Sequence, residues 1–204
     1  MCSRAAGISA RIDGVTKPYE SLDARPVTYA PVGATAASDE AWGETLPGFR
    51  RYEQTAPVAV PWGDARSLML RWGVKTRSGF VVSAPNGSTS PNVVEGASYW
   101  LRFRVGPVAV TEPVRVIAVV DEPLRCGFAY ATLDGHPVSG EEAFVISRCA
   151  DRAPVLLTIR SLTQPAAGGF WRYTFPVLLA AQQVFRRRYL RSLNATAAPS
   201  IGTP

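Results

Sequence analysis

The stretch Gly127-Phe-Ala-Tyr-Ala-Thr-Leu-Asp-Gly-His136-Pro-Val-Ser-Gly140-Glu-Glu142 decides the fold, because its pattern predicts a strand, a compact turn and a second strand. Side chains alternate along a strand, so Phe128, Tyr130 and Thr132 share one bulky face, opposite a mostly small one. The Asp-Gly pair at 134–135 provides turn chemistry, since glycine takes positive φ easily and aspartate can bond to the backbone. A sheet with one bulky and one small face suits the lining of a cavity or contact with a helix.

Further β-strands are predicted on both sides of this hairpin. The segment 97–105 shows the clearest alternation, with Tyr99, Leu101 and Phe103 on one side and polar or basic residues on the other. The other extended segments are rich in residues that favour strands, and they cover 27–32, 50–54, 80–83, 107–110, 114–120, 142–147 and 156–162. The segment 114–120 is almost entirely apolar, so we expect it in the centre of the sheet.

Two helices are predicted. The first, near residues 64–72, begins with Asp64 as a cap and should end at Gly73 in a left-handed conformation. The second covers residues 176–193, about 27 Å of helix, and carries a broad apolar stripe. Basic residues crowd its last turns, where cations complement the helix dipole.

The order of these elements predicts an α+β fold. A curved antiparallel β-sheet wrapped around the long C-terminal helix is the simplest way to bury both apolar faces, with the short helix near 64–72 beside it. The 204 residues suffice for one such domain with a sizeable core. We expect a flexible N-terminal lead over 1–25, a single domain over 26–194 and a disordered tail over 195–204.

The hairpin also resembles a known family. Its segments Gly127-Phe-Ala-Tyr-Ala-Thr-Leu, Gly135-His-Pro and Gly140-Glu-Glu-Ala-Phe-Val resemble the signature of the uncharacterised protein family 0548, a domain of unknown function. The resemblance covers most of residues 27–193, because further matches are Leu46-Pro-Gly-Phe, Val114-Arg-Val-Ile-Ala-Val-Val-Asp-Glu-Pro and Arg187-Arg-Tyr-Leu-Arg. Ala131 departs from a glycine common in that family, which indicates slightly less room in the strand. The family has no established activity, so the resemblance implies a fold and no mechanism.

The order of elements is also similar to that of the helix-grip folds of the START and Bet v 1-like superfamily. Those folds typically hold an apolar ligand between sheet and helix, which implies a cavity in the same place here. The likeness is one of topology: no residue matches a ligand motif of the superfamily, and a fold alone does not determine function.

Composition and charge limit the classes of function. The net charge of +6 is carried far more by arginine than by lysine and favours association with phosphates or anionic surfaces. No run of about 18 apolar residues predicts a transmembrane helix, and residues 1–10 lack an apolar core of secretory length, so the cytoplasm is the expected location. Cys2, Cys126 and Cys149 cannot all pair and show no metal-ligand spacing, so free thiols are expected. No metal or cofactor is predicted.

The hairpin and the long helix together predict a site for a small apolar or amphipathic molecule. The residues expected to contact that ligand come from the bulky strand faces and the helix stripe, and they are Tyr99, Phe103, Phe128, Tyr130, Phe144, Leu178, Ala181 and Phe185.

The alternative is an enzyme that uses His136 with Glu141 and Glu142 as acid and base. A carboxylate beside a histidine holds its tautomer and raises its pKa. Against this, a histidine in a Gly-Pro turn commonly has a structural role. The adjacent Glu141 and Glu142 should point to opposite faces of their strand, and a buried Glu142 would pair with an arginine such as Arg115 or Arg160.

The arginines at 186–191 have two interpretations, as do the aromatic and basic residues that alternate over 97–105. Such groups can form a surface that binds nucleic acid or a membrane. A solvated helix end and ordinary core packing explain both patterns locally, and we favour that interpretation. No nucleic-acid partner is therefore expected, and the sequence leaves open the oligomeric state and whether the protein catalyses a reaction.

Overall fold

The computed structural model describes residues 21–35, 42, 46–89, 91–105, 108–166, 168 and 175–194. The predicted tail and most of the predicted lead lie outside this part of the chain. Within the remainder of the lead, a short 3-10 helix, η1 (Leu22–Ala24), has its first residue buried.

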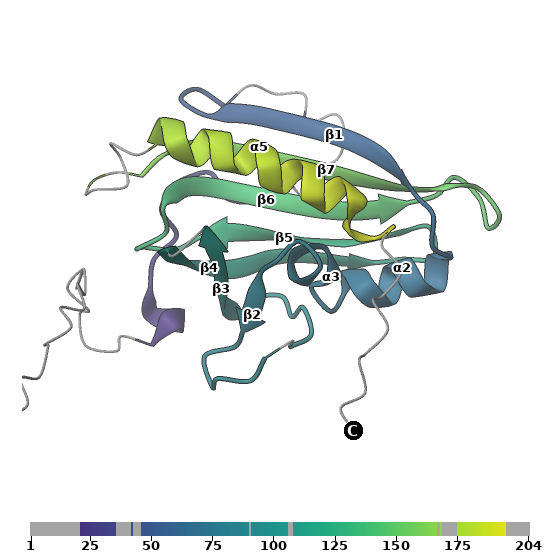
Figure 1. Ribbon diagram of the computed structural model, residues 1–204, viewed down its shortest axis with the longest axis horizontal. Coiled ribbons are helices and arrows are strands. Elements are labelled where there is room, and N and C mark those ends of the chain that lie inside the picture. Colours follow the sequence, from purple (N-terminus) through teal and green to yellow (C-terminus); the bar gives the residue numbers. More distant parts are fainter. Residues whose placement is uncertain are drawn as a thin grey trace, which may run out of the picture.

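A seven-stranded antiparallel sheet forms the body of the protein, with the strand order β1-β7-β6-β5-β4-β3-β2. Strands β2 to β7 therefore follow one another as a meander, and β1, the first strand in the chain, lies at the edge of the sheet beside β7 (Figure 1). Their bounds are β1 (Arg50–Val58), β2 (Val81–Ser83), β3 (Ser98–Val105), β4 (Val108–Asp121), β5 (Arg125–Thr132), β6 (Val138–Ser147) and β7 (Val155–Pro165).

Among the described residues, three α-helices accompany the sheet: α2 (Trp62–Met69), α3 (Gly73–Thr76) and α5 (Phe175–Ser192). The long α5 lies across one face of the curved sheet, and α2 and α3 lie near the end of the same face (Figure 1). The predicted α+β helix-grip fold, with one long C-terminal helix and a short helix near 64–72, is therefore confirmed.

The alternation along the hairpin places its aromatic face toward α5. Phe128 pairs with Phe144 across β5 and β6, and Tyr130 pairs with Glu142 in the same register. Gly140 keeps β6 close to β7, because a Cβ at this position would lie 1.9 Å from the carbonyl oxygen of Leu162, and its φ of +145° also favours glycine. The hairpin turn is shorter than expected, since β6 already begins at Val138.

The core between sheet and helices is built from aromatic rings. Trp72 is fully buried, and its ring centroid lies 5.0 Å from that of Tyr99 and 4.7 Å from that of Phe128. Under α5, the ring of Phe185 lies 4.8 Å from Phe103 and 4.9 Å from Phe80. Such edge-to-face and tilted pairs contribute roughly 0.5–1.5 kcal/mol each beyond the area they bury. These rings hold α5 against the sheet.

The predicted strand at 27–32 is wrong, because only Val27 forms a bridge, to Leu133. Pro26 precedes this segment and Pro31 lies within it, and neither has the N–H that a ladder needs. The segment still follows the end of β5, since Thr28 donates its N–H to the carbonyl of Thr132 at 3.2 Å.

The predicted end of the first helix is also wrong in its detail. Trp72, not Gly73, takes the left-handed conformation, with φ 60°, and Gly73 begins α3. Glycine is required at 73 for space, because a Cβ there would lie 2.6 Å from the carbonyl oxygen of Leu68. The turn places the ring of Trp72 at the centre of the core.

The segments 107–110 and 114–120 were expected as two strands, but they form the single long strand β4. Pro113 is tolerated within it because β5 ends at Thr132, opposite Val114, so the proline lies just past the paired end of β5. A bulge between Val116 and Ala118 then bends the strand.

Candidate functional site

A cavity of about 70 Å³ lies between α5 and the sheet face that α5 covers. Its walls come from α3, β3 to β7, the hairpin turn and α5. A cavity of roughly 150 Å³ can hold benzene, and a single water needs roughly 10–15 Å³. The space therefore suits several waters or a compact ligand.

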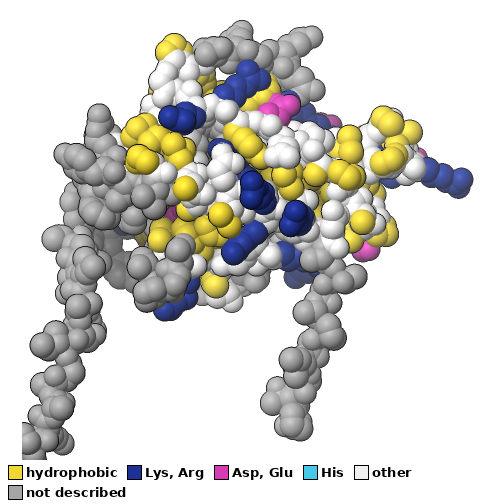
Figure 2. Space-filling model, turned by 45° about the horizontal axis from the view of Figure 1, so that its top comes forward, with side chains coloured by type: hydrophobic (Ala, Val, Ile, Leu, Met, Phe, Trp, Pro, Cys, Tyr) yellow, Lys and Arg dark blue, Asp and Glu magenta, His cyan; other side chains and the backbone are white. Residues whose placement is uncertain are grey.

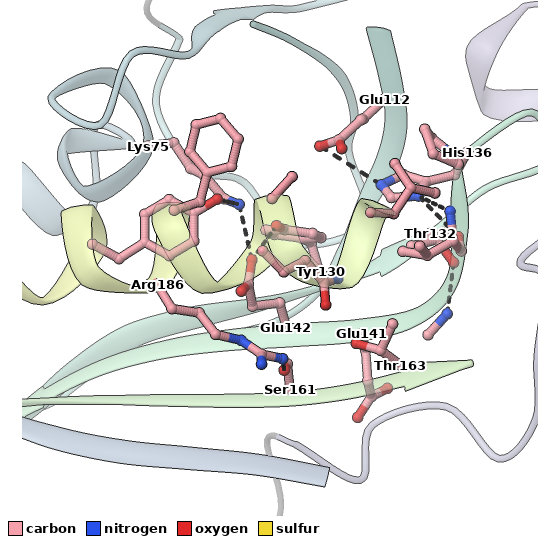
Figure 3. Close-up of a pocket in the computed structure, with 18 of the residues that line it drawn as sticks. Lys75, Glu112, Tyr130, Thr132, His136, Glu141, Glu142, Ser161, Thr163 and Arg186 are labelled. Atoms are coloured by element: carbon pink, nitrogen blue, oxygen red, sulfur yellow. Dashed lines mark hydrogen bonds and ion pairs between the residues drawn. The ribbon is translucent and has the colours of Figure 1, made fainter. Parts of the chain in front are cut away.

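An ion pair between a buried lysine and a mostly buried glutamate closes one side of this cavity. The Lys75 Nζ, from α3, donates hydrogen bonds to Oε2 of Glu142 at 2.8 Å and to the hydroxyl of Tyr189 at 2.7 Å. The Tyr130 hydroxyl donates to the same oxygen of Glu142 at 2.6 Å (Figure 3). Burial, followed by the negative charge of Glu142, raises the pKa of both tyrosines well above the ordinary value, so both hydroxyls stay protonated.

Aromatic rings surround the Lys75 ammonium as well. Its Nζ lies 4.3 Å from the ring centroid of Tyr189, 4.7 Å from that of Phe80 and 5.0 Å from that of Tyr130. Ring faces attract a cation, most strongly where water is excluded. The expected partners of Glu142, Arg115 and Arg160, are wrong: Arg115 bonds to Ser98 and to the backbone near η1, and Arg160 bonds to Glu53.

His136 faces a different carboxylate from the one predicted. Its Nε2 lies 3.8 Å from Oε2 of Glu112, on β4 (Figure 3). The other ring nitrogen, Nδ1, lies 2.8 Å from the carbonyl oxygen of Val138 and 3.1 Å from its amide nitrogen, which fixes the ring in the turn.

Burial displaces the pKa values of His136 and Glu112 in opposite directions. Burial lowers the pKa of His136 to about 3, against the backbone hydrogen bond to Val138, which raises it. Burial raises the pKa of Glu112 to about 7, opposed by the positive charge of Lys75 and assisted by the negative charge of Glu142. Near neutral pH the histidine is therefore neutral, and the carboxyl of Glu112 is partly protonated.

Glu141 is among the residues that line the cavity, but its carboxylate does not belong to this chemistry. Its carboxylate accepts hydrogen bonds from the Tyr29 hydroxyl and from the backbone N–H groups of Gly33 and Thr35. Glu141 and Glu142 thus point to opposite sides of β6, as the strand pattern predicted (Figure 3). Glu141 fixes the segment before β1 to the outer face of the sheet.

Arg186 is the second buried cation in the cavity wall. It belongs to the arginine-rich end of α5, which the sequence predicted as a solvated face, and for Arg186 that interpretation is wrong. Its Nη2 donates to Oγ of Ser161 on β7 at 2.8 Å (Figure 3). Its neighbours Arg187, Arg188 and Arg191 are exposed, and Figure 2 shows basic side chains spread among apolar ones over one face of the molecule.

The structure divides the predicted ligand-contacting residues into two groups. The cavity-lining group consists of Phe103, Tyr130, Leu178, Ala181 and Phe185. The remaining residues lie in the core behind it, and they are Tyr99, Phe128 and Phe144.

Sequence reasoning missed Lys75, Glu112 and the inward role of Arg186. Lys75 lies in a short Gly-Val-Lys-Thr helix and Glu112 beside a proline, and neither setting carries a pattern that signals burial. Tyr189 lies within the helix predicted over 176–193, but nothing in the sequence signals its hydrogen bond to a buried lysine.

Cysteine and metal chemistry find no support in the described part of the chain. Cys126 is a buried free thiol whose pKa burial raises to about 12, and Cys149 is free and exposed, whereas Cys2 lies outside the described residues. The described residues hold no group of three or more His, Cys, Asp or Glu side chains suited to a metal ion. No described helix is both long and apolar enough to cross a membrane.

The sheet, its covering helix and the cavity between them define a helix-grip protein. The family described as "Domain of unknown function (DUF1990)" matches residues 28–192, and the chain belongs to this family. A "UPF0548 protein" of Deinococcus radiodurans is 44% identical over 83 residues, which span 41% of this chain and 41% of that relative. The resemblance that the hairpin motif carries is thereby confirmed.

Two solved structures are similar in fold. A hypothetical protein, jhp0584, from Helicobacter pylori superposes with a TM-score of 0.52 at 9% identity, over 73% of this chain and 89% of that one. The crystal structure of Ara h 8.0201 gives a TM-score of 0.46 at 11% identity, over 72% of this chain and 100% of that one. At 9% identity the first likeness concerns the fold alone.

Proposed function

We propose that this protein binds a small amphipathic molecule in the cavity between the sheet and α5. The observation that carries the proposal is the composition of the cavity wall, in which aromatic rings lie beside buried ionisable groups. Sites for small molecules are mostly apolar, with a few polar groups that fix orientation.

Apolar and charged groups line the same space. Phe103, Phe185 and Leu178 provide the apolar contact surface near the sheet edge and on α5. The Lys75–Glu142 pair and Arg186 provide charged hydrogen-bonding groups. A ligand with one apolar end and one polar end satisfies both, whereas a purely apolar ligand would cover the buried charges without pairing them.

Ala181 offers a direct test, because it lines the cavity from α5 while its neighbour Ala180 is exposed. We expect Ala181→Trp to fill the cavity and abolish binding of a ligand found by screening or by copurification. Ala180→Trp, the matched control, should fold and bind like the wild type. Unchanged binding by a folded Ala181→Trp variant would rule out this cavity as the site.

A second candidate function is acid–base catalysis on a small molecule in the same cavity. The observation that favours it is the facing pair of His136 and Glu112, whose side chains both line the cavity and whose pKa values are strongly displaced. Glu142, the partner first expected for His136, is engaged by Lys75 and Tyr130 instead.

This candidate has its own test. His136→Gln and Glu112→Gln should each slow consumption of a substrate identified by incubation with a metabolite mixture, while ligand binding is retained. If both variants turn over every consumed metabolite at the rate of the wild type, acid–base chemistry by this pair is excluded.

A further inference from the structure

Arg186 differs from the other arginines of α5 in its surroundings. It is 7% exposed, whereas Arg187 and Arg188 point into solvent. Its guanidinium carbon lies 3.8 Å from the ring centroid of Tyr52, and Nη2 bonds to Ser161. The guanidinium is therefore held firmly in the wall of the cavity by a ring on β1 and a hydroxyl on β7.

The hydrogen bonding of this guanidinium is incomplete within the described residues. Its Nε is buried and has no acceptor among them, and none of their carboxylates lies within ion-pair distance. One turn earlier on α5, Oε1 of Gln182 is also buried and without a donor from the described chain. Leaving a buried donor of a charged group unmet costs free energy on the order of 1–3 kcal/mol or more. A site in the cavity wall that bears this cost is prepared for a group from outside the protein.

The charges around the cavity indicate the sign of that group. Lys75 and Glu142 compensate each other at 2.8 Å. His136 is neutral near pH 7, because burial lowers its pKa to about 3, and Glu112 is partly protonated, because burial raises its pKa to about 7. Arg186 is left with a positive charge that these groups offset only in part. Burial also lowers the pKa of Arg186, against the nearby charge of Glu142, as expected for a cation whose compensation is incomplete.

We propose that the cavity ligand is a small organic monoanion, whose carboxylate is bound by the guanidinium of Arg186 and whose short apolar body packs on Phe103 and Phe185. This inference rests on the proposed binding function and names the chemical class of its ligand. A carboxylate matches the planar donors of arginine and the single spare positive charge. A phosphate dianion would bring one more negative charge than this cavity compensates, and the volume of about 70 Å³ favours a short acid.

The test compares butyrate with butyramide, which has nearly the same shape and no charge. Titrations by calorimetry or by chemical-shift changes at pH 6 should show that the full-length protein binds butyrate at least about tenfold more tightly than butyramide. Arg186→Gln should remove that preference, and Arg186→Lys should reduce it while keeping the charge. Arg187→Gln, an exposed neighbour on the same helix, is the matched control and should leave both affinities unchanged.

The remaining outcomes distinguish a failure of the monoanion assignment from a failure of the cavity as a binding site. Equal binding of butyrate and butyramide, or an undiminished preference for butyrate in folded Arg186→Gln or Arg186→Lys, would overturn the assignment of a monoanion to Arg186. Binding of butyramide that Ala181→Trp abolishes would then leave the cavity as a binding site for a neutral ligand. If neither probe binds at millimolar concentrations, the short-acid assignment fails, and the proposed function stands or falls by the Ala181→Trp experiment alone.

Discussion

Replacing Glu112 by glutamine should change how the stability of the protein depends on pH. In the folded protein, burial raises the pKa of Glu112 from its ordinary 4.5 to about 7. Below pH 4.5 the carboxyl is protonated in both the folded and unfolded states, and it carries no penalty. As the pH rises from 4.5 to 7 the unfolded chain ionises first, so the wild type loses stability, and above 7 the full penalty is present.

The size of this effect follows from the two pKa values. Each pKa unit corresponds to about 1.4 kcal/mol, so the full penalty is on the order of 3 kcal/mol. Between pH 5 and pH 8 the wild type should lose roughly 2.5 kcal/mol through this one group. Glutamine has nearly the same shape and does not ionise, so Glu112→Gln should gain this amount relative to the wild type over the same interval. His136 contributes in the opposite sense at lower pH, because its pKa is depressed, but it does so in both proteins and cancels in the difference.

The measurement is the free energy of unfolding in urea, followed by tryptophan fluorescence, at a series of pH values from 5 to 8. Glu122→Gln is the matched control, since Glu122 is exposed at the end of β4, and its curve should run parallel to that of the wild type. A Glu112→Gln curve that is also parallel to the wild type would refute the conclusion that burial perturbs this carboxyl.

Three further changes test other parts of the structure by urea unfolding. Lys75→Met should cost about 3 kcal/mol, because it leaves the mostly buried charge of Glu142 without its cation. Adding Glu142→Gln should recover part of this loss, and additive losses would contradict a coupled pair. Glu141→Gln should cost about 2 kcal/mol, since an amide replaces a carboxylate that accepts three hydrogen bonds, and a neutral result would mean that these bonds do not anchor the segment before β1. Gly127→Ala should destabilise strongly, because its Cβ would lie 2.1 Å from the carbonyl oxygen of Phe144, whereas Gly63→Ala in α2 meets no atom and should stabilise by up to about 1 kcal/mol; equal effects would contradict the packing of β5 on β6.

The hairpin shows what the sequence could predict about the fold. Residues Phe128 and Tyr130 were assigned to one face because strand alternation depends only on local geometry, and the register across β5 and β6 preserves that face. The long helix was equally predictable, since its apolar stripe repeats over the whole of α5. The order of such elements then permitted few compact arrangements.

Predictions of local structure failed where one residue type or composition fits more than one conformation. Gly73 fits a helix end with positive φ, but in the structure it is required by its closeness to Leu68, and Trp72 takes the left-handed conformation. The N-terminal segment at 27–32 fits a strand by composition, but Pro26 before it and Pro31 within it prevent a continued ladder. The prolines were visible in the sequence, whereas the closeness of Gly73 to Leu68 shows only in the structure.

The site was less predictable than the fold, because burial of a charge is decided by tertiary contacts. His136 and Glu142 were identified, but their partners were not: Glu112 and Lys75 come from separate elements that reach the cavity only in the folded protein. Arg186 had a sufficient local explanation at a helix C-terminus, and that explanation concealed its role in the cavity wall.

The most direct test of a ligand-binding cavity is a native mass spectrum of the purified protein, recorded before and after incubation with a metabolite mixture. We predict a stoichiometric mass increase in the wild type and in Ala180→Trp, carried by a compact amphipathic molecule, and its loss in Ala181→Trp. A spectrum that shows only the bare chain in all three proteins, both as purified and after incubation, would contradict the proposal that this cavity binds a small molecule.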